Sequence, residues 1–202
     1  MKTADSGQLL ELLRKRDPAA CTQCVQEHSD EIYRLALRML RDPQEAEDVV
    51  QETFLSAFRG IGSFQGRSSL RTWLFRIAYN ASLMRLRRSH PETLSVEATE
   101  SDEDEPIELF DFSNLPEEKV LRHEVHDQIE TAIQSMPSRL RAVFALRELE
   151  SLSTAETAEV LGLSEEAVKT RLHRGRLWLR ERLSHYFAER EGVAGGPSDG
   201  RR

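Results

Sequence analysis

Six basic residues lie within fourteen positions near the C-terminus: Lys169, Arg171, Arg174, Arg176, Arg180 and Arg182. Lysine and arginine at this density favour binding to the phosphates of a nucleic acid, because each cation displaces a counterion from the backbone. The whole chain of 202 residues is nevertheless acidic, with net charge -7. The basic cluster therefore predicts a nucleic-acid contact that is confined to one helix.

A second group combines aromatic rings with arginines in the first half of the chain. Phe75 and Tyr79 are one helical turn apart and are flanked by Arg71 and Arg76. Exposed rings can stack on unpaired bases while guanidinium groups hold the phosphates. The alternative is that these rings pack beneath the preceding glycine-rich loop or a linker. The pattern predicts an outer face on this helix that binds single-stranded nucleic acid.

A third group has the spacing of metal ligands. Cys21, Cys24 and His28 follow one another at i, i+3 and i+7, which would aim three ligands in one direction. All three also lie on an apolar stripe of helical period, and no fourth ligand is close in sequence. We therefore favour a buried core position for them and predict neither a metal nor a cofactor.

The elements that position the basic cluster have strong local signals. Ser153 and Glu156 have the spacing of a capping box, which opens a short helix over 154–161, and Gly162 has the position of a left-handed C-cap. Ser164 then caps a second helix after a short turn. Together these features predict a helix-turn-helix. Its expected base-contacting residues are Glu166, Lys169, Thr170, His173 and Arg174, and its expected phosphate-contacting residues are Arg171 and Arg176.

The N-terminal part also consists of helices by its pattern. Asp17 and Asp42 each precede a proline, which is the arrangement of an N-cap followed by the first helical residue. The helix that follows Asp42 carries Asp48 and Glu52 opposite its apolar side, with Gln51 at the margin. Such a face is either solvated or a docking surface for a basic partner.

Charge divides the chain into segments. Residues 91–118 hold eleven carboxylates, three prolines and no Lys or Arg, which indicates an extended or disordered linker. This linker is either a solvated spacer or an internal mimic of nucleic acid. We predict an all-α protein with two small helical domains, over 1–90 and 119–190, the second a helix-turn-helix, joined by this flexible acidic linker and followed by a disordered tail over 191–202.

Composition excludes other classes of protein. No apolar run approaches the roughly 20 residues that span a bilayer, and the N-terminus lacks a basic-then-apolar leader, so we expect a cytoplasmic protein without membrane insertion. Two cysteines fit a reducing compartment. No phosphate-binding Gly-rich loop and no nucleophile paired with a base is evident, so the sequence predicts that the protein is not an enzyme.

Two blocks of sequence resemble those of extracytoplasmic-function (ECF) sigma factors of bacterial RNA polymerase. The first combines DPQEAEDVVQETFLSAF with SFQG and TWLFRIAYN, and the second is LSTAETAEVLGLSEEAVKTRLHRGRLWLR. The resemblance spans about residues 5–188, and the joint occurrence of both blocks is more specific than a helix-turn-helix alone. The segment CTQC departs from the family, which has bulkier apolar residues there, and this leaves a redox role for the cysteines open.

The resemblance implies a function and a role for each block. The chain would bind RNA polymerase core and direct transcription initiation at promoter DNA, with Asp48, Gln51 and Glu52 docking on the polymerase. The second helix of the helix-turn-helix would recognise the minus-35 element. Recognition of the minus-10 element would involve Phe64, Arg71, Trp73, Phe75, Arg76, Tyr79 and Asn80, with a flipped base held near Phe64, Trp73 and Asn80.

The family also implies a partner that the sequence itself does not reveal, which is an anti-sigma factor. Two other functions remain open: a sigma-like decoy that binds an antagonist but no promoter, and a self-sufficient helix-turn-helix regulator. The intact basic face of the second helix argues against the decoy. The absence of a recognisable dimerisation or ligand-binding domain argues against the regulator.

Overall fold

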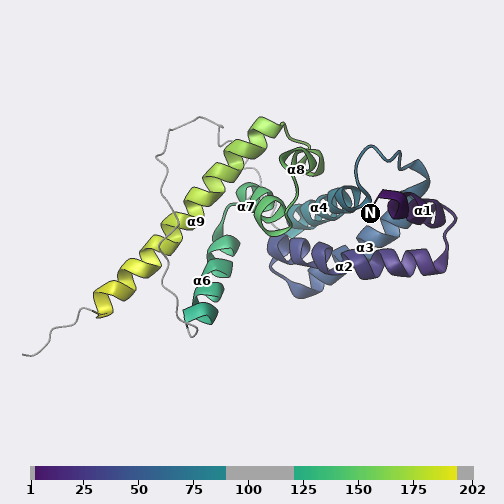
Figure 1. Ribbon diagram of the computed structural model, residues 1–202. Helices are drawn as coiled ribbons and strands as arrows, with labels where there is room; N and C mark the ends of the chain where they lie inside the picture. The colour runs from purple at the N-terminus through teal and green to yellow at the C-terminus, as the bar shows by residue number, and fades with distance from the viewer. Residues whose placement is uncertain (1–2, 90–120, 195–202) are drawn as a thin grey trace, which may run out of the picture.

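The computed structural model describes residues 3–89 and 121–194, and every regular element in these ranges is helical (Figure 1). The predicted linker over 91–118 lies outside the described residues, as do residues 195–202 of the predicted tail over 191–202. The first four residues of that predicted tail belong to the last helix, α9. The elements are α1 (Thr3–Arg14), α2 (Pro18–Leu40), α3 (Pro43–Gly60), the 3-10 turn η1 (Ile61–Ser63), α4 (Leu70–Ser89), α6 (Leu121–Ser135), α7 (Ser138–Phe144), the π-helical turn η2 (Ala145–Leu149), α8 (Thr154–Leu161) and α9 (Glu165–Ala194). The predicted all-α class is confirmed.

Helices α2, α3 and α4 form a bundle, with α1 against one end. The predicted N-caps are present: the Asp17 carboxylate accepts a hydrogen bond from the Ala20 amide at 2.9 Å, and Asp42 accepts from the amides of Gln44 and Glu45. The apolar stripe of α2 faces the bundle, where Ile32 and Leu35 are fully buried. Each such side chain contributes about 1.5–3 kcal/mol to folding.

Helices α6 to α9 form the second half of the molecule. The long helix α9 packs against α6, α7 and α8 and extends away from the first half (Figure 1). Val168 and Leu172 of α9 are buried against Ile133, Met136 and Phe144. This half has its own small apolar core, which holds α8 and α9 in a fixed relation.

The two halves pack against each other. Helix α8 contacts α4, and α7 contacts α2. Leu146 and Leu152 of the second half belong to the same buried cluster as the residues of α2 and α4. The sequence predicted two domains separated by a linker but contained no sign of this contact. No helix among the described residues is long and apolar enough to cross a membrane.

Candidate nucleic-acid interface

The predicted helix-turn-helix is present in α8 and α9. The Ser153 amide donates to the Glu156 carboxylate at 2.8 Å, and the Ser153 hydroxyl accepts from the Glu156 amide at 3.2 Å. Gly162 has φ of 67°, in the left-handed region that favours glycine. The Ser164 hydroxyl accepts from the Ala167 amide at 3.1 Å and so caps α9. These local bonds set the angle at which α9 leaves the turn.

Glu156 links this capping box to the first half of the molecule. The Ser153 amide and then its hydroxyl lower the pKa of the Glu156 carboxyl, and the Thr72 hydroxyl of α4 donates to it at 3.2 Å. Since these hydrogen bonds favour the ionised carboxylate of Glu156 in the folded protein, they stabilise the fold at pH values above about 4.3, the pKa of a glutamate in the unfolded chain. The stabilisation is lost as the pH falls through the lowered pKa.

The residues predicted to contact DNA lie on the faces of α9 that point away from the core. Val168 and Leu172 point into the core, and Gly175 is buried against Met136 and Phe144, as the helical period requires. The predicted DNA-contacting side chains lie on the remaining faces. Those that are exposed are Glu166, Lys169, His173 and Arg176, and those that are partly exposed are Thr170, Arg171 and Arg174. The structure therefore presents a mostly basic face to solvent.

Two side chains of this face already have acidic neighbours. Lys169 lies 3.4 Å from the Glu166 carboxylate, and Arg176 lies 2.7 Å from that of Glu148. Both pairs are exposed, so each contributes little to stability and exchanges readily for another anion. Neither pair therefore holds its basic side chain firmly in place.

The loop before α4 places two of the predicted minus-10 residues in contact. The rings of Phe64 and Trp73 are 4.9 Å apart and tilted by 35°. Both side chains are almost buried, and Arg14 of α1 donates to the Phe64 carbonyl at 2.9 Å. Asn80 lies exposed further along α4, and Tyr79 is partly buried. The two rings therefore pack on each other in the region where the resemblance implies a base pocket.

The prediction that Phe75 lies on an outer face of α4 is wrong. Its side chain is only 1% exposed, and the Arg71 guanidinium lies over the ring at 5.0 Å. The reason is that α4 packs against α2 and α3 on one side and against α8 on another. Met84 lies at nearly the same helical angle as the buried Trp73 but is 52% exposed. Packing between the two halves therefore overrides the simple two-faced pattern.

The two arginines of α4 that were predicted to bind nucleic acid are paired with acidic residues. Arg71 donates to the Glu31 carboxylate at 2.7 Å and to the Glu150 backbone carbonyl at 2.7 Å. Arg76 lies 3.7 Å from the Glu159 carboxylate of α8. Since Glu150 and Glu159 belong to the second half, this half covers part of the predicted minus-10 surface.

The acidic face of α3 is present, but it has a partner that the sequence analysis missed. Arg85 of α4 contacts three carboxylates of α3, at 2.5 Å from Glu45, 3.6 Å from Asp48 and 3.2 Å from Glu52. Arg85 follows the buried Ser82 by one turn, and this spacing could have placed it toward α3. The Asp48 and Glu52 side chains remain 43% and 48% exposed, so both can still contact a second protein.

A hollow of about 370 Å³ opens beside this face, between α2 and α3. Its walls are formed by Ser29, Asp30, Tyr33, Glu47, Val50 and Gln51. Gln51, the third predicted polymerase-binding residue, therefore lies at the edge of a concave surface. Such a surface suits the side chains of a helix that lies across it.

The cysteine pair belongs to the core of the bundle. Cys24 is buried and Cys21 partly buried. Among the side chains that the structure describes, no group of three or more His, Cys, Asp or Glu is arranged to hold a metal ion. Burial, and then the nearby Cys21 and Glu27, raise the pKa of the Cys24 thiol to about 12. Burial also lowers the pKa of His28.

Cys24 should react slowly with iodoacetamide at pH 8 in the folded protein. The thiolate is the nucleophile, and with a pKa of about 12 its population is roughly a thousandfold below that of a free thiol with a pKa of about 8.5. Mass spectrometry of alkylated peptides from folded protein and from protein in urea measures the ratio. Equal rates in the two states would contradict the buried position.

Two family descriptions match the chain. Residues 24–91 match Sigma-70 region 2, and residues 126–179 match Sigma-70 region 4. SigW of Bacillus subtilis, an ECF RNA polymerase sigma factor, is 36% identical over 180 residues, which cover 85% of this chain and 92% of the relative. The chain belongs to the ECF sigma factors. The sigma-H factor of Pseudomonas aeruginosa is 34% identical, with 84% and 89% covered.

Solved structures show the same fold. CnrH, solved in complex with the cytosolic domain of CnrY, has a TM-score of 0.64 at 24% identity, covering 89% of this sigma factor and 97% of CnrH. RpoE of Bartonella quintana, solved with the anti-sigma factor NepR, has a TM-score of 0.60 at 22% identity, covering 81% and 96%. Since the match to each structure covers most of both chains, the similarity of fold extends over both halves of this sigma factor.

Proposed function

We propose that this ECF sigma factor binds RNA polymerase core and directs it to promoters through two DNA contacts. The observation that carries the proposal is the combination of a helix-turn-helix with a solvent-facing basic side and a separate bundle with an acidic docking face. Sigma-70 regions 4 and 2 match these two parts. A regulator that acts without polymerase would not need the second surface.

Helix α9 supports recognition of the minus-35 element. Its N-terminal half presents Lys169, His173 and Arg174 toward solvent, where they can reach base edges in a major groove. Arg171 and Arg176 flank this row and suit the phosphates on either side. The capping bonds of Ser153 and Ser164 fix the angle of α9, so the contact would need little reordering.

The helical bundle of the first half offers surfaces for the other two proposed contacts, with the minus-10 element and with the polymerase. Phe64, Trp73 and Asn80 lie on the loop and the helix that follow α3, and an unpaired base would be held there after its extrusion from the duplex. Asp48, Gln51 and Glu52 of α3 form a face complementary to a basic helix of the polymerase. The proposal also includes two domains, over 1–90 and 119–190. It places the action of the protein in the cytoplasm, with the polymerase.

The chemistry of initiation is the polymerase's in this proposal, and the sigma factor supplies only binding. An anti-sigma factor is a further proposed partner, because the relatives CnrH and RpoE were each solved with a second protein. The test of function is transcription by bacterial polymerase core with and without this protein on a random-promoter library. Enrichment of paired motifs only with both components supports the proposal, whereas DNA binding without polymerase favours a self-sufficient regulator.

Replacing Arg174 or Lys169 by Ala should change promoter choice in the holoenzyme. Loss of a side chain that reads a base edge costs about 1–3 kcal/mol at one or two base pairs. Arg176→Ala should instead weaken binding evenly across sequences, because a phosphate carries no sequence information. Selection of minus-35 sequences by each variant measures the difference. An unchanged preference in both of the first two variants would refute the groove assignment.

A further inference from the structure

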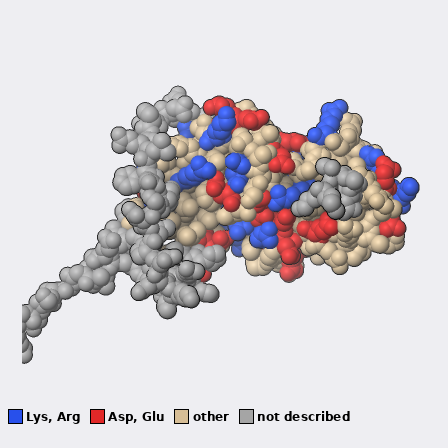
Figure 2. Space-filling view, in the orientation of Figure 1, with Lys and Arg blue, Asp and Glu red and all other residues tan. Residues whose placement is uncertain are grey.

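One end of the bundle carries exposed basic side chains without acidic partners. The end of α1 and the loop between α3 and α4 lie together there, away from α9 (Figure 1), and basic side chains project from this end in Figure 2. Four exposed cations belong to the turn after α1, the end of α3 and the loop, and we call them the basic rim: Lys15, Arg16, Arg59 and Arg67. Within residues 3–89 and 121–194, none of these four side chains has an acidic partner.

Two contacts place the basic rim beside the proposed base pocket. The Arg14 guanidinium at the end of α1 donates to the Phe64 carbonyl at 2.9 Å, so the turn that follows lies next to the loop. A Cβ atom at Gly60, the last residue of α3, would lie 3.7 Å from the Trp73 ring, so Arg59 directly precedes a residue against that ring. The basic rim therefore borders the two rings near which an extruded base is proposed to bind.

The backbone at Arg16 is a second, independent observation. Arg16 has φ of 57°, in the left-handed region that is unfavourable for residues other than glycine. The Asp17 amide donates to the Leu12 carbonyl at 3.0 Å, which closes α1 in a turn where glycine usually precedes that amide. Residues in such strained conformations cluster at binding sites. The strain at this position points to a use for the Arg16 side chain.

Arg41 shows what such a side chain can do. It has the same left-handed conformation at the end of α2, with φ of 62°. Its guanidinium donates to the Gln134 carbonyl of α6, so its side chain serves a contact within the folded protein. Arg16 has no corresponding contact in the part of the chain that the structure describes. Its partner must therefore be sought outside those residues.

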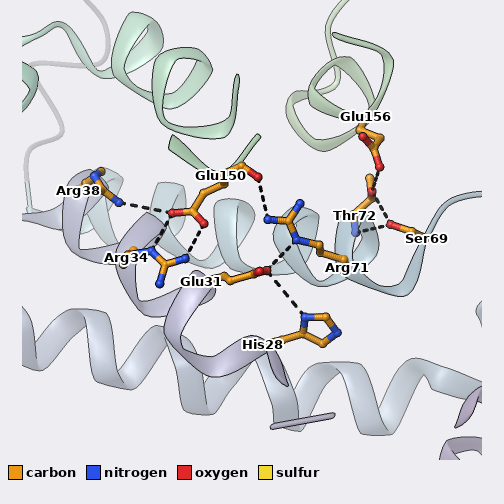
Figure 3. Close-up of polar contacts among 9 residues, drawn as sticks. All are labelled: His28, Glu31, Arg34, Arg38, Ser69, Arg71, Thr72, Glu150 and Glu156. Atoms are coloured by element: carbon orange, nitrogen blue, oxygen red, sulfur yellow. Dashed lines mark hydrogen bonds and ion pairs between the residues drawn. The ribbon is translucent and has the colours of Figure 1, made fainter. Parts of the chain in front are cut away.

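Other arginines of the first half already have carboxylate partners. Arg34 donates to both oxygens of the buried Glu150 carboxylate at 3.1 and 2.8 Å, and Arg71 donates to Glu31 at 2.7 Å (Figure 3). The basic rim has cations alone, and a cluster of like charges attracts a polyanion. The unpaired strand of a promoter is a polyanion that reaches this end, because the proposed pocket holds one of its bases.

We propose that the basic rim binds the phosphates of the unpaired promoter strand next to the extruded base. This inference rests on the proposed function, since the base near Phe64 and Trp73 brings the strand to this end of the bundle. It extends the DNA contact from α4 to the turn after α1. Contacts with phosphates carry no sequence information, so the basic rim stabilises the open strand whatever its bases are.

Lys15→Gln and Arg16→Gln each remove one charge and keep a long polar side chain. The measurement is the affinity of holoenzyme for a fluorescein-labelled fork template, in which the minus-10 region and several nucleotides on either side of it are single-stranded. Each variant should bind about fivefold more weakly in 0.1 M salt, and the salt dependence should fall by about 0.7 per lost phosphate contact. Arg139→Gln, which removes one partly exposed cation of α7, is the matched control and should change neither quantity.

Arg16→Gly separates binding from folding. Glycine relieves the left-handed strain, so this variant should melt at or slightly above the wild-type temperature. It should nevertheless bind the fork template as weakly as Arg16→Gln. If Arg16 served the fold alone, the affinity of both variants would equal that of the wild type, and the proposal would be overturned.

Two shorter templates locate the phosphates. In each, the unpaired strand ends at the extruded base, on one side or on the other. On one of them the wild type and both Gln variants should bind equally, because the contacted phosphates are missing. Undiminished losses on both short templates would place the basic rim on another part of the DNA and overturn the inference.

A separate measurement on immobilised polymerase core tests the alternative partner. Both Gln variants should bind core as the wild type does. Weaker core binding would mean that the basic rim contacts an acidic surface of the polymerase, which would also overturn the inference. Failure of the proposed function itself would appear differently, as absent binding of wild-type holoenzyme to every template.

Discussion

Replacing Asp48 and Glu52 together by Lys should abolish co-purification of the protein with polymerase core. Both carboxylates are nearly half exposed on α3, and the proposed partner surface is basic. Like charges brought together across an interface cost several kcal/mol, which corresponds to a loss of about a hundredfold or more in affinity. Affinity chromatography on immobilised core measures the loss.

Arg85 requires a second variant in this experiment. Lysines at positions 48 and 52 would repel its guanidinium, which contacts both carboxylates in the folded protein. Asp48→Asn with Glu52→Gln removes the attraction to the polymerase without creating that repulsion. This neutral variant should melt near the wild-type temperature and show an intermediate loss of core affinity.

The control is a charge reversal of the same size elsewhere. Glu11→Lys with Glu27→Lys changes two exposed acids of α1 and α2 and should leave core binding intact. If the Asp48 and Glu52 variant bound core as well as this control, α3 would not be the docking helix. If both lost binding equally, net charge would explain the effect.

The helix-turn-helix could be predicted from sequence because its signals are local. A capping box, a glycine at the left-handed C-cap and a serine N-cap each act within a few residues. The structure confirms all three, at Ser153, Gly162 and Ser164. Whatever the tertiary contacts are, these bonds form within the segment itself.

The faces of α4 could not be predicted in the same way. The helix has apolar residues around most of its circumference, so its period alone does not decide which side faces solvent. Helix α4, which carries Phe75, packs against α8, and Arg71 of α4 donates to the Glu150 carbonyl; both partners are far away in the chain and reach α4 only when the two halves meet. A similar long-range contact places Arg85 among the acids of α3. The spacing of residues along α4 predicts the direction of each side chain. It does not predict which distant helix that side chain will meet.

Glu150 shows the same limit for a single charge. In the sequence it is one of two acids near the end of η2, and nothing distinguishes it from the exposed Glu148. Only the fold brings Arg34 and Arg38, more than a hundred positions earlier, to its carboxylate. A buried acid can therefore be expected from sequence only if its partner is local.

The second large effect concerns strand opening, and Asn80 is the residue that tests it. Asn80→Ala should leave core binding unchanged but reduce open complexes on a duplex promoter by about 1–3 kcal/mol, the cost of losing one base contact. Asn80 is exposed, so its replacement should alter stability by less than about 0.5 kcal/mol. Permanganate reactivity of unpaired thymines in the promoter measures the open complex.

Phe64 is less suitable for this test, although the same pocket would use it. Its ring packs on Trp73 and is nearly buried, and Phe→Ala in a core costs about 3–5 kcal/mol. A defect in that variant would combine lost folding with lost base contact. Asn80 avoids this problem because its side chain supports no core contact.

Two comparisons complete the test of Asn80. On a promoter that is already unpaired over the minus-10 element, Asn80→Ala should recover part of its activity, since the base no longer has to leave a duplex. Gln23→Ala, which removes an exposed amide side chain from α2, should behave as wild type on both templates. A defect of equal size on duplex and unpaired promoters would place Asn80 outside strand opening. No defect on the duplex would mean that extrusion of the base depends on other residues, and the pocket assignment near Trp73 would fail.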